Sequence, residues 1–461
     1  MKTKSFGLAL LSVAALTAAI FSSCKKENRM NDGRAVSASQ VIPSSAVLSG
    51  VLGTGHAVRD TILLTSGIEW HLSGLVYVDS SDVLIIQPGT RILGDVSPTA
   101  GVAGGGLIVT KNAKILADGQ SATTPIVFTS ERWNTTPASG DWSGVVLLGN
   151  APTNVPTTTR VEGVTDLTPA DATFGGSNAA DNSGILRYVR IEYAGFALSL
   201  NNELNGLTLA GVGNGTTIDY VEVFKANDDA FEWFGGTVNA SHLLAIDALD
   251  DMFDTDNGYS GTISYALGLS DTTRADQSQS NGFESDNNAT GTTATPVTHA
   301  KYNNITIVGL PNAAKASITN GAPSGTGKYG RAAHLRRNAE FEIKNAIFLG
   351  FNNGVVFDTN LGSTYTKFTS GISTASGNYV HGFVNAYATE NGGIFTNLAA
   401  PTGNTGYIAA NPNGSILLAS PFNRSSAANF VPGALAPAGV KASGAFPTGN
   451  TTWANGWSKF N

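Results

Sequence analysis

The chain has 461 residues, with 34 acidic and 27 basic side chains and a formal net charge of -7. An acidic chain without a basic cluster argues against nucleic acid and anionic lipid headgroups as binding partners. Charged residues make up only 13% of the chain, apolar residues 41%, and there are 54 glycines, a composition that disfavours disorder and favours many short strands.

The N-terminus has the pattern of a bacterial lipoprotein signal peptide. Lys2 and Lys4 precede an uncharged, mostly apolar run over residues 6–21, and Cys24, the only cysteine, follows two serines. The alternative is a single membrane-spanning helix, but the run is shorter than the roughly 20 residues that a bilayer needs. The pattern therefore predicts a lipid attached to Cys24.

This interpretation divides the N-terminal part into two segments. Residues 1–23 are expected to be a cleaved signal peptide, and residues 24–58 the lipidated cysteine and a polar, flexible tether. We expect the protein to be an outer-membrane lipoprotein of the cell envelope that contacts the membrane only through its lipid. The sequence does not decide between the periplasmic and the surface-exposed face.

Residues 59–426 alternate short apolar runs with turn residues, and none of this region has sustained helical spacing. Equivalent residues return after 22 positions, or 32 between Tyr188 and Tyr220, whereas hairpin folds have turns of about two to five residues. Such a period predicts an all-β solenoid, a parallel β-helix. A β-propeller is the alternative, but its blades need roughly 40 residues.

One stretch repeats its carboxylates. Phe231 and Glu232 recur as Phe253 and Asp254, 22 positions later, within the longer pair of sequences "DDAFEWFGG" and "DDMFDTDNG". "NGFESDNN" supplies a third copy in Glu284, at an offset of 30 that implies an extra loop. If the coils stack in register, Glu232, Asp254 and Glu284 lie about 4.8 Å apart on neighbouring strands.

Several longer motifs suggest a family. They include "VLIIQPGTRILGD", "GDWSGVVLLGNAPTN", "DDMFDTDNGYSG", "ADQSQSNGFESDNN", "AHLRRNAEFEIKNAIFLGF" and the closing "NFVPGALAPAGVKASGAFPTGNTTWANGWSKFN". These motifs resemble secreted right-handed parallel β-helix lipoproteins of Bacteroidota-type bacteria, from about residue 60 to the end of the chain. The resemblance implies a right-handed parallel β-helix and a cell-envelope location, but no established activity, so no catalytic residue carries over.

The repeated acids permit three interpretations. In the first, the acids accept hydrogen bonds from backbone N–H groups at the coil corners and face water. In the second they hold a calcium ion, and in the third they catalyse cleavage of a polysaccharide. The candidate calcium ligands are Asp254, Asp256, Glu284 and Asp286. Calcium is the only cofactor that the pattern suggests.

The catalytic interpretation has two forms. A glycoside hydrolase uses two carboxylates, and stacked coils supply the required separations. A polysaccharide lyase needs calcium and a basic group, which "GRAAHLRRN" offers. The candidate catalytic residues are Glu232, Asp254, Glu284, Arg336 and Arg337, with His334 and Arg331 nearby.

Aromatic residues lie close to the repeated acids. Phe231 and Phe253, at equivalent positions, predict an internal stack. Trp233 has Thr255 as its equivalent in the next copy, so it is expected on the surface, and Trp233 and Tyr259 are candidate glycan-binding residues.

Residues 427–461 are expected to close the solenoid, with Trp453 and Trp457 over its last coil. The function that the sequence favours is a non-enzymatic envelope lipoprotein that displays a β-helix to bind a glycan or another surface component, stiffened by calcium. The alternative is a polysaccharide lyase or glycoside hydrolase acting on the acidic face.

Overall fold

A computed structural model describes residues 40–53, 59–99, 101–164, 172–199, 202–319 and 325–461. Cys24 and the predicted signal peptide lie outside these residues. The described residues belong to one compact unit, Ala38–Asn461. Among them, no helix is both long enough and apolar enough to cross a membrane.

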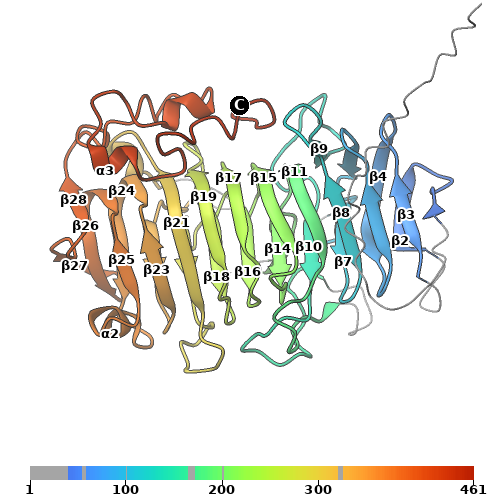
Figure 1. Ribbon diagram of the computed structural model, residues 1–461, viewed down its shortest axis with the longest axis horizontal. Coiled ribbons are helices and arrows are strands. Elements are labelled where there is room, and N and C mark those ends of the chain that lie inside the picture. The colour runs from blue at the N-terminus through green and yellow to red at the C-terminus, as the bar shows by residue number, and fades with distance from the viewer. Residues whose placement is uncertain (1–39, 54–58, 100, 165–171, 200–201, 320–324) are drawn as a thin grey trace, which may run out of the picture. The chain divides into compact units, whose positions relative to one another are not determined.

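The strands form three parallel ladders, to which successive coils contribute either a short strand or one half of a long strand (Figure 1). The predicted all-β parallel β-helix is therefore confirmed. In the first ladder, each strand pairs with the equivalent strand of the next coil. Its members are β1 (Gln40–Val41), β3 (Thr61–Leu64), β5 (Val83–Ile86), β8 (Lys114–Asp118), β23 (Glu340–Lys344), β25 (Thr374–Ser376) and the first halves of β11 (Gly184–Glu192), β15 (Thr217–Phe224), β17 (Ala240–Ile246), β19 (Thr262–Leu269) and β21 (His299–Val308).

The second ladder continues from the first through a bend within the long strands. Its members are the first halves of β2 (Val47–Leu52), β4 (Glu69–Val78), β24 (Ile347–Asp358) and β26 (Tyr379–Asn391), the second halves of β11, β15, β17, β19 and β21, and the whole of β6 (Arg91–Gly94), β9 (Ile126–Ser130) and β28 (Thr405–Ile408).

The third ladder carries the repeated acids. Its members are the second halves of β2, β4, β24 and β26, with β7 (Gly106–Val109), β10 (Gly144–Leu148), β14 (Leu207–Ala210), β16 (Phe231–Phe234), β18 (Phe253–Asp256), β20 (Phe283–Ser285) and β22 (Arg331–Leu335). β27 (Ile394–Leu398) adds antiparallel to β26. The remaining elements are the β12–β13 hairpin (Ala197–Ser199 and Asn202–Glu203) and short helices at Ala313–Ala316 (α1), Thr364–Thr369 (α2), Ala427–Phe430 (η2) and Ala438–Lys441 (α3).

The bend between the first two ladders falls on residues with left-handed backbone conformation. Tyr188, Tyr220, His242 and Tyr265 have φ of 51–55°, which is unusual for residues with large side chains. Their rings stack in sequence on the outside, with centroids 4.5, 4.3 and 5.3 Å apart. We call these four residues the aromatic column, and infer that its stacking offsets part of the backbone strain.

The interior is a continuous apolar core. Phe231 and Phe253 stack inside it with ring centroids 5.6 Å apart, so the predicted internal stack is confirmed. Phe283 occupies the next rung, which confirms that the three copies of the repeat are in register. The 30-residue offset is accommodated by a strand-free segment, residues 270–282, between β19 and β20.

The segment after β28, residues 409–461, is not confined to the last coil. We call it the C-terminal strap; it runs back along the outside of the second ladder (Figure 1). Trp457 contacts Tyr188 and Tyr220 edge-on, and Trp453 packs on Tyr220 and His242. The expectation that both tryptophans cap the final coil is therefore wrong. The physical reason is that outward-facing apolar residues of the second ladder, among them Leu244 and Leu267, need a cover.

Candidate functional site

Glu232, Asp254 and Glu284 occupy consecutive rungs of the third ladder, on β16, β18 and β20. We call these three residues the acidic row. Their neighbours Phe231, Phe253 and Phe283 point into the core, so alternation along each strand turns the acids outward. Thr208 precedes the row in the same column and His334 follows it.

A second column of acids lies at the corner where each coil enters the third ladder. Asp229 accepts a hydrogen bond from the backbone N–H of Asp251 (2.8 Å), and Asp251 accepts one from the N–H of Asn281 (2.6 Å). Each side chain thus satisfies the amide of the equivalent residue in the next coil. The interpretation of the acids as corner acceptors holds for Asp229 and Asp251, but no such bond to the acidic row is found among the described residues.

Asp254 is the centre of the carboxylate cluster. One of its oxygens lies within 4.8 Å of oxygens from Asp229 and Glu232, and one lies within 4.8 Å of oxygens from Asp251 and Glu284. Its Oδ1 is buried and has no hydrogen-bond partner in the described part of the chain. Burial, and after it the charge of Glu284, raises the pKa of Asp254 well above its usual range.

Glu232 is also poorly compensated. Its side chain is buried and accepts a hydrogen bond from the Asn205 amide, whose own Oδ1 has no hydrogen-bond partner among the described residues. Burial, followed by the charges of Glu162 and Asp254, raises the pKa of Glu232 well above its usual range. No lysine or arginine ion pair to Glu232 or Asp254 occurs within the described ranges.

Glu284 has the opposite environment. Arg336 forms an ion pair with it, and His334 Nδ1 lies 3.2 Å from Oε2. Desolvation by itself raises the pKa of Glu284, but the Arg336 charge and the His334 hydrogen bond outweigh it and lower the pKa to about 2. The acidic row therefore has an ionised, paired member beside an unpaired Asp254 that favours a proton or a cation.

The two predicted basic residues are committed to ion pairs. Arg336 also binds Asp286 through Nε at 2.8 Å, and Arg337 binds the other oxygen of Asp286 at 2.7 Å. Both oxygens of Asp286 are therefore occupied by arginines. Asp256, predicted as its partner in metal binding, belongs to none of the ligand groups found around Asp254 in the described residues.

Beyond the row lies a buried charge network, in which the sequence indicated Arg331 and His334 but not their partners Glu390 and Asp358. Arg331 and Glu390 form an ion pair, and both side chains are about 95% buried. His334 Nε2 lies 3.7 Å from both Glu390 and Asp358. No sequence spacing relates Glu390 to Arg331, 59 positions earlier, because the turns between coils differ in length here. Asn205, by contrast, could have been found from the repeat. It lies two positions before β14, just as Asp229 lies two positions before β16.

The two predicted glycan-binding aromatics are inside the protein. Trp233 and Tyr259 are both fully buried, with ring centroids 5.6 Å apart. The expectation that Trp233 lies on the surface is wrong, because it is two positions after the inward Phe231 and so shares its face. Thr255, its equivalent in the next coil, is buried as well.

The raised pKa values of two acids near the acidic row, Asp250 and Asp256, predict that the protein loses stability as the pH rises. Burial and like charges raise the pKa of Asp250 and of Asp256 to about 7, from 3.8. The folded state then holds more protons than the unfolded state between about pH 4 and 7, so the free energy of unfolding falls across this window. Glu284 acts in the opposite sense, but only below its ordinary value of 4.5.

Urea unfolding in EDTA at pH 5.5 and pH 8 measures this dependence. We expect a lower midpoint at pH 8, and a smaller difference in the Asp250→Asn, Asp256→Asn double variant. A midpoint that is equal or higher at pH 8 contradicts the prediction.

One family model matches this chain, over residues 55–457, and describes a pectate-lyase-like β-helix domain. Comparisons with curated proteins and with solved structures give no match. The matched range includes every strand of the three ladders from β3 onward, together with the acidic row. The chain therefore belongs to the pectate-lyase-like β-helix family.

Proposed function

We propose that this protein binds an acidic polysaccharide through a calcium ion held at Asp254, and that it is displayed on the cell envelope by a lipid at Cys24. The family description supports a carbohydrate-related role, since it names a β-helix like that of an enzyme acting on an acidic polysaccharide. The finer proposal depends on the chemistry of the acidic row.

The observation that carries the proposal is the unpaired Oδ1 of Asp254 among four neighbouring carboxylates. A carboxylate with a buried oxygen that lacks a hydrogen bond or cation is costly, and either a proton or a bound cation relieves that cost. The donors are all carboxylate oxygens, which calcium prefers over softer ligands. Asp251, Asp254 and Glu284 would hold the ion, with Asp229 and Glu232 as the neighbouring set.

Bound calcium would supply a positive charge on an otherwise acidic face. A uronate carboxylate can then approach the row, which would repel it without the ion. The ion would thus link the protein carboxylates to those of the glycan. Arg336 is less suited to binding a glycan carboxylate, because it already forms ion pairs with Glu284 and Asp286.

Affinity electrophoresis in gels containing polygalacturonate tests the proposal. We expect the parent protein to be retarded with calcium and to migrate freely in EDTA, and Asp254→Asn to migrate freely in both. Glu342→Gln, which removes an exposed acid of the first ladder, is the matched control and should behave as the parent does. Retardation that is equal in parent and Asp254→Asn contradicts the proposal.

A glycoside hydrolase is the second candidate, and a specific observation favours it. The environment raises the pKa of Asp254 and lowers that of Glu284, while their oxygens approach within 4.8 Å. Divergent pKa values in a carboxylate pair suit a general acid beside an ionised nucleophile, and the short spacing suits retention. The lyase is less favoured, because ion pairs with Glu284 and Asp286 raise the pKa of Arg336 and prevent it from accepting a proton.

Product analysis separates the two candidates. If the parent protein releases reducing ends from a glycan panel and Glu284→Gln binds the same glycan without product, the hydrolase is supported. Binding without product in the parent supports the non-enzymatic role.

The lipid anchor is a separate prediction. Cys24→Ser should abolish incorporation of radiolabelled palmitate and move the protein from the membrane to the soluble fraction, because lipid addition needs the thiol. Labelling that persists in Cys24→Ser rules out this attachment site.

A further inference from the structure

Three outward side chains of the second ladder gather in the N-terminal coils, away from the acidic row. His71 lies on β4, Asp95 directly follows β6, and Glu131 directly follows β9. The backbone N–H of Glu131 donates to the carbonyl of Gly94 and that of Asp95 to the carbonyl of Leu72, so the three residues belong to three successive coils. We call them the His71 cluster.

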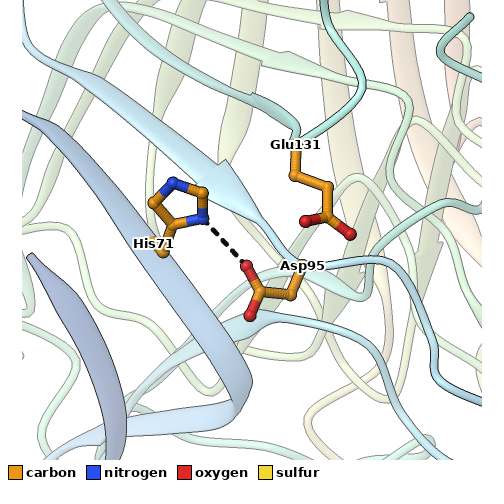
Figure 2. A group of neighbouring side chains, drawn as sticks. All are labelled: His71, Asp95 and Glu131. Carbon is orange, nitrogen blue, oxygen red and sulfur yellow. Dashed lines mark hydrogen bonds and ion pairs between the residues drawn. The ribbon is translucent and has the colours of Figure 1, made fainter.

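The donor atoms of this cluster converge. One atom each from His71, Asp95 and Glu131 lies within 4.8 Å of the other two, and His71 Nδ1 is 3.0 Å from Asp95 Oδ1 (Figure 2). Figure 2 shows the Glu131 carboxylate directed toward the same space. The backbone N–H of Val96 donates to Glu131 Oε1 at 2.8 Å, which holds that side chain in place and leaves Oε2 for another partner.

Nearby cations do not neutralise these carboxylates. Among the described residues, neither Asp95 nor Glu131 has an ion pair with lysine or arginine. Arg91 is bound to Glu69 and stacks over Trp133, and Arg132 faces Asp141. Two carboxylates thus share a single imidazole.

A second histidine of the same chain provides a contrast. His299 also contacts two carboxylates, those of Glu340 and Glu342, at 3.0 and 3.2 Å. Both of its ring nitrogens are engaged, and Lys367 and Lys301 pair with the same two glutamates. The His299 cluster is therefore charge-balanced by side chains, whereas the His71 cluster is not.

We propose that His71, Asp95 and Glu131 bind a divalent transition metal of the zinc type. One imidazole nitrogen and two carboxylate oxygens are a donor set that suits zinc, and three protein ligands leave a position open to solvent. Metal–ligand distances of about 2.0–2.2 Å need donors roughly 3–3.5 Å apart, so the 3.0 Å pair already has the required spacing and Glu131 needs only a small side-chain adjustment. The mixed donor set separates this site from the acidic row, whose donors are all oxygens.

The open coordination position would allow the metal to bind a ligand from another molecule. An exposed metal with a free coordination position binds a carboxylate, imidazole or hydroxyl from outside the chain. The side chains of His71 and Asp95 are 34% and 28% exposed, so an external ligand can reach the ion.

Zinc titration against a chromogenic competitor tests the proposal on the EDTA-treated protein. We expect a zinc site in the parent that His71→Gln and Glu131→Gln each weaken about tenfold or more. His299→Gln and Asp254→Asn are the matched controls and should retain the affinity of the parent. Cobalt(II) in place of zinc should give visible absorption bands that His71→Gln removes.

Two results would overturn the proposal. One is a parent that does not bind zinc, and the other is His71→Gln and Glu131→Gln variants that bind it as His299→Gln does. Circular dichroism checks that His71→Gln is folded; if it is not, Glu131→Gln decides, because its exposed side chain is not part of the core.

Discussion

In EDTA at pH 8, Asp254→Asn is expected to raise the free energy of unfolding, and to remove the stabilisation that calcium gives to the parent. Two carboxylates about 5 Å apart repel by about 3 kcal/mol at an effective dielectric constant of 20, and Asp254 faces several. Calcium at 100 times its dissociation constant should add about 2.7 kcal/mol to the parent only. Urea unfolding with and without calcium measures both effects.

Asp286→Asn is the informative comparison, with the opposite expected sign. Asp286 is bound to Arg336 and Arg337, so its neutralisation leaves Arg337 without its carboxylate partner and Arg336 with Glu284 alone, which destabilises the protein. If Asp254→Asn destabilises the calcium-free protein as Asp286→Asn does, Asp254 is not an uncompensated charge, and the calcium proposal loses its basis.

Trp457→Ala should detach the C-terminal strap from the aromatic column. Trp457 is fully buried against Tyr188 and Tyr220, and its carbonyl accepts a hydrogen bond from Arg190 at 2.8 Å. Removal of a buried tryptophan side chain costs about 3–5 kcal/mol. Because a solenoid need not unfold in one step, hydrogen exchange of residues 443–461 is the appropriate measurement.

We expect amides of the strap to lose protection in Trp457→Ala while those of the third ladder keep it. Trp133→Ala is the control, since Trp133 is 36% exposed and lies outside the strap. If strap protection is unchanged in Trp457→Ala, the strap is held by its other contacts, such as those of Lys459 with Glu192 and Glu222.

The fold and the register of the acidic row could be predicted from sequence because the repeat is local. A coil of 22 residues returns each side chain to the same face. The spacing of Phe231 and Phe253 therefore predicts that their rings stack and that Glu232 lies beside Asp254. The 30-residue offset to Glu284 remained predictable because the same Phe–acid pair marks the next rung, whatever the length of the intervening loop.

Contacts between distant segments were not predictable in this way. Nothing in the sequence relates Trp457 to Tyr188, because the strap crosses coils without a period of its own. The outward apolar residues of the second ladder belong to short apolar runs whose sequence does not indicate which segment covers them. Trp233 was misplaced for a different reason: the absence of an aromatic equivalent outweighed the strand alternation, and alternation decides the face.

The charge state of each acid in the row depends on which side chains the fold brings next to it. Sequence predicted a cluster of acids, but not that Arg336 pairs with Glu284 while Asp254 is left unpaired. That asymmetry follows from which coil carries the arginines, and it separates the two pKa values.

Isothermal titration calorimetry of the EDTA-treated protein with calcium at pH 7.5 tests the proposed site most directly. We predict saturable binding in the parent, abolished in Asp254→Asn and retained in Glu342→Gln. The absence of binding in the parent, or equal binding in the parent and Asp254→Asn, would contradict a calcium site at the acidic row.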